Sequence, residues 1–243
     1  MLVYRSVFIS DLHLGSKHCR VDAVLNFLKN VRCENLYLVG DIIDGWRLQK
    51  KWYWPKEHTD VLRQIMRMSN KGVNVVYIPG NHDEFLRTII GKGTQFGNIK
   101  IQQKAVYESL KGERILVVHG DLFDYLMKTK FGRRVMSLGD WAYDVVAWIN
   151  IKYNQWRKWR GLPLFSVAKY LKAKAKAAAN FVGTFEEEMA NYCKSKRYHG
   201  IICGHIHTPR ISTIHGILYM NDGDWVENCS ALVETLDGEW KII

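Results

Sequence analysis

Short apolar runs that end in polar side chains recur along this chain, and they constrain its fold more than any other feature. Each run is short and rich in β-branched or aromatic residues, which is typical of a buried strand. The five clearest are Val3–Ser10, Leu36–Val39, Val73–Ile78, Ile115–Val118 and Gly200–Cys203. Between the early runs, residues 21–28 and 61–66 carry apolar side chains at helical spacing. This alternation predicts an α/β fold with parallel strand pairs.

Further short runs late in the chain predict hairpin strands. They are Ala105–Leu110, Ile211–Ile214, Ile217–Met220, Ala231–Leu236 and Trp240–Ile243. Parallel and antiparallel pairs together fit a mixed sheet, or two stacked mixed sheets with helices outside. A chain of 243 residues with 47% apolar residues can bury one sizeable core, so we expect residues 1–243 to form a single domain.

Residues 125–195 interrupt this rhythm with long helical patterns and little strand signal. Residues 128–197 hold fifteen Lys and Arg against five Asp and Glu, a net charge of +10 out of +11 for the whole chain. We therefore expect a basic helical cap inserted into the domain. An anionic partner such as a nucleic acid, a lipid headgroup or a phosphorylated substrate would suit it, and net charge alone does not choose among these.

The cysteines and the apolar runs bear on the cellular compartment. Five cysteines, an odd number without close pairs, favour a reducing compartment over a disulfide framework or a thiolate zinc site. The N-terminus reaches Asp11 and His13 too early for a signal peptide, and no apolar run is long enough to span a bilayer. The expectation is a cytoplasmic protein whose contact with a membrane, if any, is peripheral.

Side chains suited to metal binding follow each of the five strands. They are Asp11 and His13, Asp41, Asn81, His119, and finally His205 and His207. Because ligands in α/β folds gather at the carboxyl ends of strands, these residues can converge although nearly 200 positions separate them. Their donors are oxygen and imidazole nitrogen without thiolate, which favours Mn²⁺, Fe or Zn²⁺.

Seven candidate ligands are too many for one tetrahedral ion and suit two. A pair of ions roughly 3.5 to 4 Å apart activates a water-derived hydroxide and neutralises charge on a phosphoryl group. The pattern therefore indicates hydrolysis of a phosphoester or phosphoanhydride. Taken singly the motifs are weaker, because Asp11 could cap a following segment and Gly40–Asp44 could be a turn. The remaining histidines, His18, His58, His199 and His215, are interpreted as ordinary structural residues.

The blocks DLH, GDIID, GNHD, HGD and GHIH together resemble the signature of the calcineurin-like metallophosphoesterases. The resemblance covers the whole chain except the insert. It implies two mixed sheets flanked by helices, and it divides the candidate ligands between two ions that share Asp41. The first ion would be held by Asp11, His13, Asp41 and His207, and the second by Asp41, Asn81, His119 and His205.

The same resemblance gives His82 and Asp83 catalytic roles. His82 would protonate the leaving group or stabilise the transition state without binding metal, and Asp83 would orient it. An imidazole suits this role because its pKa lies near neutrality.

The insert bears on the substrate. Trp141, Val145, Trp148, Trp156 and Trp159 lie near one helical face with Lys152 among them. An ordinary amphipathic helix pair packed on the core explains such an apolar stripe, but tryptophans beside basic residues also suit a lipid boundary. With this insert and the late segment NDGDWVEN, the chain most resembles the UDP-2,3-diacylglucosamine diphosphatase branch of the family. The resemblance implies a Mn²⁺ enzyme that releases UMP and a lipid-sugar phosphate at the cytoplasmic face of the inner membrane.

Two departures from that branch leave alternatives open. Its best-defined members carry Arg at the position of His82 and Glu near that of Ile43–Asp44. The chain could therefore be a paralogue with another phosphoester substrate, such as a phosphodiesterase or a nuclease whose insert follows a phosphate backbone. A metal-free binding scaffold is disfavoured, because every ligand position is filled.

Overall fold

The computed structural model describes residues 2–91, 93–123, 160 and 167–243, with side chains of 167–180 left aside. The chain divides into two compact units, one of residues 1–122 and 186–243 and the other of residues 123–185. The first unit contains all nine predicted site residues. Most of the predicted insert, including its tryptophans, lies outside the described residues, so its role as a cap stays a prediction.

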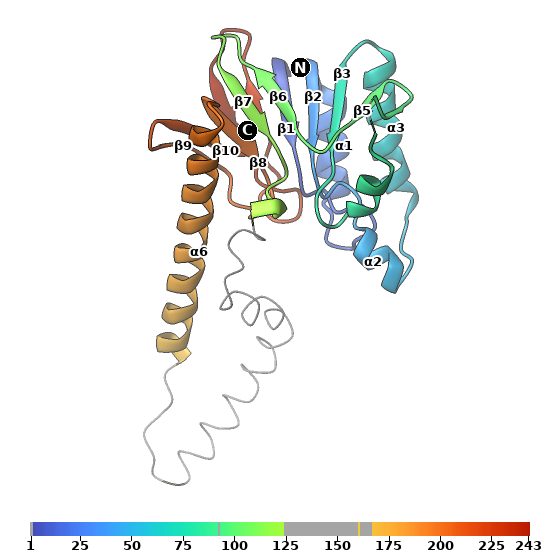
Figure 1. Cartoon of the computed structure of the whole chain (residues 1–243). Coiled ribbons are helices and arrows are strands. Elements are labelled where there is room, and N and C mark those ends of the chain that lie inside the picture. Colours follow the sequence, from blue (N-terminus) through green and yellow to red (C-terminus); the bar gives the residue numbers. More distant parts are fainter. Residues whose placement is uncertain (1, 92, 124–159, 161–166) are drawn as a thin grey trace. The chain divides into compact units, whose positions relative to one another are not determined.

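Two sheets form the first unit (Figure 1). The seven-stranded sheet has the order β12-β11-β1-β2-β3-β5-β4, and the five-stranded sheet has the order β6-β7-β8-β10-β9. The strands of the first sheet are β1 (Leu2–Ile9), β2 (Val31–Val39), β3 (Asn74–Ile78), β4 (Gln95–Phe96), β5 (Ile99–Ile101), β11 (Leu232–Glu234) and β12 (Trp240–Ile242). Those of the second are β6 (Ala105–Glu108), β7 (Arg114–Val117), β8 (Gly200–Cys203), β9 (Arg210–Ile214) and β10 (Ile217–Asn221).

Parallel pairing is concentrated at the centre of each sheet. The pairs β1–β2, β2–β3, β7–β8 and β8–β10 are parallel, whereas the pairs at the outer strands β12, β9 and β6 are antiparallel. The predicted fold of two mixed sheets flanked by helices is confirmed. The carboxyl ends of the parallel strands within a sheet lie at one edge, which is where the candidate ligands follow.

Alternation along the strands builds two apolar layers. In β1, Val7 and Ile9 belong to a cluster with Val24 of one helix and Val61 of another, while Phe8 joins the cluster between the two sheets. Successive strand side chains point to opposite faces, so one strand supplies both layers. Figure 1 shows the two helices, α1 (Val21–Asn30) and α3 (Lys56–Asn70), beside the seven-stranded sheet.

Other helices are shorter or lie near the second sheet. The short helix α2 (Gly45–Lys50) and the 3₁₀ helix η1 (Glu84–Ile89) follow the ends of β2 and β3. The long helix α6 (Val167–Ser195) leads into β8, and near its C-terminal end Glu186 pairs with Arg210 of β9 at 3.0 Å. No helix among the described residues is long and apolar enough to cross a membrane.

Analysis of the sequence did not predict β4 and β5, and it placed the start of β2 at Leu36 rather than at Val31. Ile99, Lys100 and Ile101 alternate over three residues only, which is too short for a periodic pattern to be recognised. The first half of β2 alternates buried Val31 and partly buried Cys33 with exposed Arg32 and Glu34, so it contains no continuous apolar run.

Candidate active site

The predicted ligands follow the ends of β1, β2, β3, β7 and β8, and short backbone hydrogen bonds join the loops that carry them. Asp11 N donates to Gly40 O at 3.0 Å, and His13 N donates to Asp41 O at 2.9 Å. Across the two sheets, His205 N donates to Asp11 Oδ2 at 2.9 Å. These bonds fix the loops of β1, β2 and β8 against one another.

Five of the predicted ligands have a left-handed backbone. The φ angles are 53° at Asp11, 50° at His13, 54° at Asp41, 71° at His205 and 51° at His207. Non-glycine residues rarely adopt this conformation, and its cost is of order 1–3 kcal/mol for each residue. The surrounding structure sustains this strain at the ends of three separate strands, which marks the region as a functional site.

The glycines of the motifs allow the loops to approach closely. A Cβ atom added at Gly80 would lie 2.6 Å from Cδ2 of His119 and closer still to Oδ1 of Asp41. A Cβ atom at Gly204 would collide with the side chains of Ser10 and Asp11. Glycine precedes the ligand in these motifs because any side chain there would occupy the space of another ligand.

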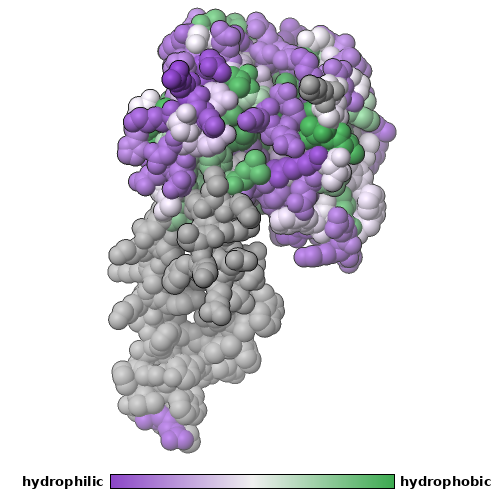
Figure 2. Space-filling view, viewed as in Figure 1, coloured by the Kyte–Doolittle hydropathy of each residue, from purple (hydrophilic) through white to green (hydrophobic). Residues whose placement is uncertain are grey.

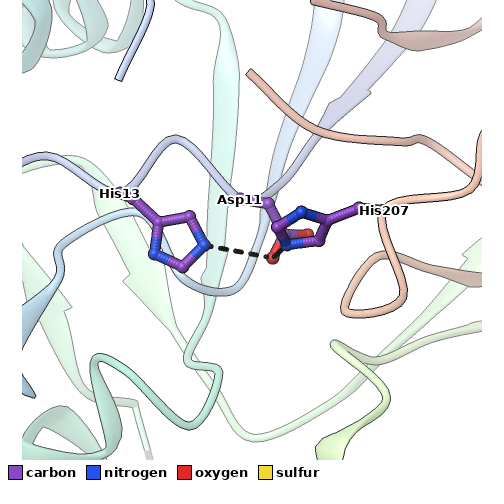
Figure 3. Close-up of side chains that lie close together, drawn as sticks. All are labelled: Asp11, His13 and His207. Carbon is purple, nitrogen blue, oxygen red and sulfur yellow. Dashed lines mark hydrogen bonds and ion pairs between the residues drawn. The ribbon is translucent and has the colours of Figure 1, made fainter. Parts of the chain in front are cut away.

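Asp11, His13 and His207 form the first cluster (Figure 3). The Nε2 atoms of His207 and His13 lie 3.0 Å and 3.6 Å from the same atom, Oδ1 of Asp11. Asp11 is fully buried, so its carboxylate has no access to bulk water. Two imidazoles therefore converge on one desolvated carboxylate oxygen.

Asp41 and His119 form the centre of a second cluster, which shares Asp11 with the first. Nε2 of His119 lies 3.3 Å from Oδ2 of Asp41, and the ring of His205 lies 5.1 Å from that of His119. Asn81 belongs to the same loop as His82, whose backbone N–H donates to Oδ1 of Asp41 at 2.8 Å. The structure thus brings Asp41 between the loops that carry the other ligands, as a bridging ligand requires.

The polar atoms of this cluster fit a metal ion. Nδ1 of His119 lies 2.8 Å from the carbonyl oxygen of Val39, which fixes the proton on Nδ1 and leaves the lone pair of Nε2 facing Asp41. That Nε2 atom and Oδ1 of Asn81 are buried without a hydrogen-bond partner. An unsatisfied buried polar atom requires an explanation, and a bound cation would satisfy both of these atoms. Oxygen and imidazole donors of this kind suit Mn²⁺, Fe or Zn²⁺.

Burial and charge pairing act in opposite directions on these groups. Burial lowers the pKa of His13, but hydrogen bonds to Asp11 and Asp44 outweigh it and raise the pKa to about 10. Burial likewise raises the pKa of Asp11, yet the charges and hydrogen bonds of the neighbouring histidines hold it well below its usual value. Negative carboxylates therefore attract protons to the imidazoles, and a divalent cation would replace those protons.

His82 forms a third possible metal-binding group with His13 and Asp41, and its ring is half-buried. Its Nδ1 atom is 2.9 Å from Oδ1 of Asp44, and its Nε2 atom is 3.9 Å from Oδ2 of Asp41. Asp44 also lies 3.5 Å from His13 and accepts a hydrogen bond from Arg47 N at the start of α2. Because the contacts with His13 and His82 lower the pKa of Asp44 against the effect of burial, its carboxylate is ionised and accepts the Nδ1 proton of His82.

Asp83 does not hold the ring of His82, and the sequence-based assignment of that role is corrected. Its carboxylate accepts from Ile42 N at 2.9 Å, from the Tyr77 hydroxyl at 2.5 Å and from Gly80 N at 2.5 Å. Asp83 therefore fixes the backbone of the two loops, and Asp44 orients His82. The signal was present in the block Gly40–Asp44, whose second aspartate lies three residues after the first.

Analysis of the sequence also missed two residues, Ser10 and Asp222, that support Asp11. The hydroxyl of Ser10 lies 2.6 Å from Oδ2 of Asp11 and 2.6 Å from Oδ1 of Asp222. Asp222 is fully buried, and burial raises its pKa well above the usual value, so the Ser10 hydroxyl bridges two buried carboxyl groups. The late segment NDGDW thus acts through Ser10 on the first cluster.

The four histidines interpreted as structural lie outside the metal-binding groups found among the described residues. His58 is buried, and its Nδ1 accepts a hydrogen bond from Gly15 N at 2.8 Å. His199 Nδ1 accepts from Arg114 N at 2.9 Å, at the start of β8. Both imidazoles hold a backbone N–H group in place, which agrees with a structural role.

Comparison with known proteins finds a matching family model and similar relatives. Residues 4–209 match the family model of the calcineurin-like phosphoesterases. A UDP-2,3-diacylglucosamine hydrolase from Neisseria gonorrhoeae is 27% identical, with 98% of this chain and 96% of the relative covered. A protein of the same name from Vibrio vulnificus is 24% identical, with 96% and 95% covered.

Among solved structures, a hypothetical protein from Pyrococcus horikoshii is similar in fold. Its TM-score is 0.52 at 12% sequence identity, and the match covers all of this chain and 87% of that one. At this identity the likeness concerns the fold alone.

Proposed function

Because the chain belongs to the calcineurin-like phosphoesterase family and is therefore a metal-dependent hydrolase of phosphoesters or phosphoanhydrides, we propose that its substrate is UDP-2,3-diacylglucosamine. The products would be UMP and a lipid-sugar phosphate. The observation that carries this proposal is the similarity to hydrolases of that name along nearly the full length of both chains.

The site supplies residues for each part of the reaction. Two divalent ions, when bound, provide the nucleophile and neutralise charge on the phosphoryl group. Asp11, His13, Asp41 and His207 would hold the first, and Asp41, Asn81, His119 and His205 the second. Manganese is the metal that we propose for the native enzyme.

His82 would protonate the leaving oxygen from Nε2. Its Nδ1 proton is held by the ionised carboxylate of Asp44 at 2.9 Å, so Nε2 is the nitrogen left for the substrate. Histidine is the side chain that most often serves as a general acid in enzymes. Asp83 contributes indirectly, by holding the backbone of the loop that carries Asn81 and His82.

The direct test is release of UMP from synthetic UDP-2,3-diacylglucosamine by the purified full chain with Mn²⁺. A matched reaction with UDP-N-acetylglucosamine, which lacks the acyl chains, tests whether the lipid is required. We expect UMP from the diacylated substrate and much less from the soluble one. Equal rates on both, or no UMP from either while a chromogenic phosphodiester is cleaved, would reject the assignment of substrate.

A phosphodiesterase or nuclease is the second candidate. His82 favours it, because the resembling branch carries Arg there and the general phosphoesterase pattern has histidine. Cleavage of single-stranded RNA or DNA with a steep decline in added salt would support this alternative, since phosphate contacts weaken as salt rises.

By extension of the first proposal, we infer that the protein acts in the cytoplasm and meets its lipid substrate at the cytoplasmic face of the inner membrane. Sedimentation of the full chain with vesicles of anionic phospholipid tests this inference. Failure to sediment under low-salt conditions would argue against it.

A further inference from the structure

Arg87 joins the two sheets beside the candidate metal centre. Its Nη1 and Nη2 atoms donate to the two carboxylate oxygens of Asp121 at 2.8 Å and 2.9 Å. Nη2 also donates to the carbonyl oxygen of Pro79 at 2.8 Å. A bidentate pair of this kind is both stronger and more directional than a single ion pair.

The three residues lie next to two candidate ligands. Pro79 follows β3 in the seven-stranded sheet and is separated from Asn81 by one glycine, while Arg87 lies in η1, at the end of the same segment. Asp121 follows β7 in the five-stranded sheet and comes two residues after His119. The ion pair therefore spans from the loop of Asn81 to the loop of His119.

In the two-ion centre proposed above, Asn81 and His119 would bind the second ion only, and they follow strands of different sheets. Oδ1 of Asn81 is buried without a hydrogen-bond partner, whereas the His119 ring is held through Nδ1, 2.8 Å from the carbonyl oxygen of Val39, with Nε2 3.3 Å from Oδ2 of Asp41. The candidates for the first ion alone, Asp11, His13 and His207, come from the loops after β1 and β8, and the shared Asp41 from the loop after β2. The Arg87–Asp121 pair contacts none of those loops through the hydrogen bonds described above.

We propose that Arg87 and Asp121 are positioning residues that set the separation of Asn81 and His119 and thereby determine retention of the second metal ion. The inference rests on the two-ion centre proposed above and adds residues outside its ligands. Loss of the pair would loosen the second site while leaving the first intact.

Arg5 offers a matched control. Its Nη1 lies 2.7 Å from Oε2 of Glu234 and also donates to the Tyr107 hydroxyl at 2.8 Å, so it too links the two sheets. The Arg5 side chain is 24% exposed, against 23% for Arg87. None of the residues around Arg5 is a candidate ligand, so its removal should affect stability alone.

The experiment measures Mn²⁺ stoichiometry and affinity by equilibrium dialysis, with electron paramagnetic resonance to distinguish paired from isolated ions. The variants are R87A, R87K, D121N and the control R5A. We expect R87A and D121N to weaken binding of the second ion by about 10- to 100-fold, the range for residues that support metal ligands. At a metal concentration that fills both sites of the wild type but not a weakened second site, R87A and D121N should contain about one ion and the wild type about two. R87K should fall between, because lysine cannot form the bidentate pair.

Wild-type affinity for both ions in R87A and D121N overturns the proposal, as does an equal loss of metal in R5A. If R87A does not fold, R87K and D121N decide. A wild-type protein that binds only one ion would overturn the two-ion centre itself, whereas failure on the lipid substrate with two ions bound would overturn only the proposed function.

Discussion

Gly80 provides a sharp test of the close approach between the loops. It lies between Pro79 and Asn81, and its backbone is not in the left-handed region, so alanine is permitted there by conformation. Space is the obstacle, because an added Cβ would lie 2.6 Å from Cδ2 of His119 and 2.8 Å from N of Asp41. Ordinary van der Waals contact begins at 3.4 Å, so the ring of His119 must retreat by about 0.8 Å.

A displacement of this size has a predictable cost. Overpacking of a filled interior destabilises a fold by about 1–3 kcal/mol. A misplacement of about 1 Å at reacting groups lowers the rate by about 10²-fold. G80A should therefore fold, lose most of its activity and bind the second ion weakly.

The assay combines thermal unfolding, metal analysis and hydrolysis of a chromogenic phosphodiester. G91A is the matched control, because Gly91 also lacks a positive φ and its added Cβ would meet nothing nearer than 3.9 Å. That variant should behave as wild type in all three measurements. Full activity and wild-type metal content in G80A would show that the loops do not need their close approach, and the geometric reasoning about the motif glycines would be wrong.

Three other predictions concern the groups around His82. H82A should lower turnover by about 10²- to 10⁴-fold, the typical contribution of a general acid, while metal content stays at the wild-type level; loss of an ion would instead make His82 a ligand. D83A should lower the free energy of unfolding by about 3 kcal/mol or more, because buried N–H donors lose their acceptor. D44N should instead leave stability nearer that of the wild type and alter the pH profile of turnover. The opposite pattern would restore Asp83 as the orienting residue. In the metal-free protein, the pKa of His13 is raised to about 10, so its protonated form stabilises the fold fully below about pH 6.5 and this contribution is lost as pH rises toward 10. A metal ion must displace that proton, so Mn²⁺ affinity should rise with pH over the same interval. Calorimetry in buffers of different ionisation enthalpy should detect the released proton. A Mn²⁺ affinity that does not change with pH would contradict this prediction.

The strands and the candidate ligands could be predicted because both follow local rules. A buried strand such as β8 is a short apolar run, and its following GHIH segment is visible without knowledge of the rest of the chain. The strands β4 and β5 were missed, since they are only two and three residues long and pairing with a neighbour decides their conformation. Strands and motifs that depend on local sequence could therefore be predicted, and strands that depend on pairing with a distant neighbour could not.

Supporting residues are harder to predict than ligands, because their function is defined only by what they touch. Asp44 and Asp83 are both aspartates near a glycine at a strand end, and nothing in the sequence says which one meets the ring of His82. The choice is made by the fold. Asp44 is the N-cap of α2, and its carboxylate lies next to His82, whereas Asp83 faces the N–H groups of its own loop and of the loop after β2. The same holds for Arg87 and Asp121, 34 residues apart, whose pairing becomes evident only when the two sheets are stacked. Substitutions at these supporting positions should therefore separate metal retention, proton transfer and stability more cleanly than substitutions of the ligands, which would change all three together.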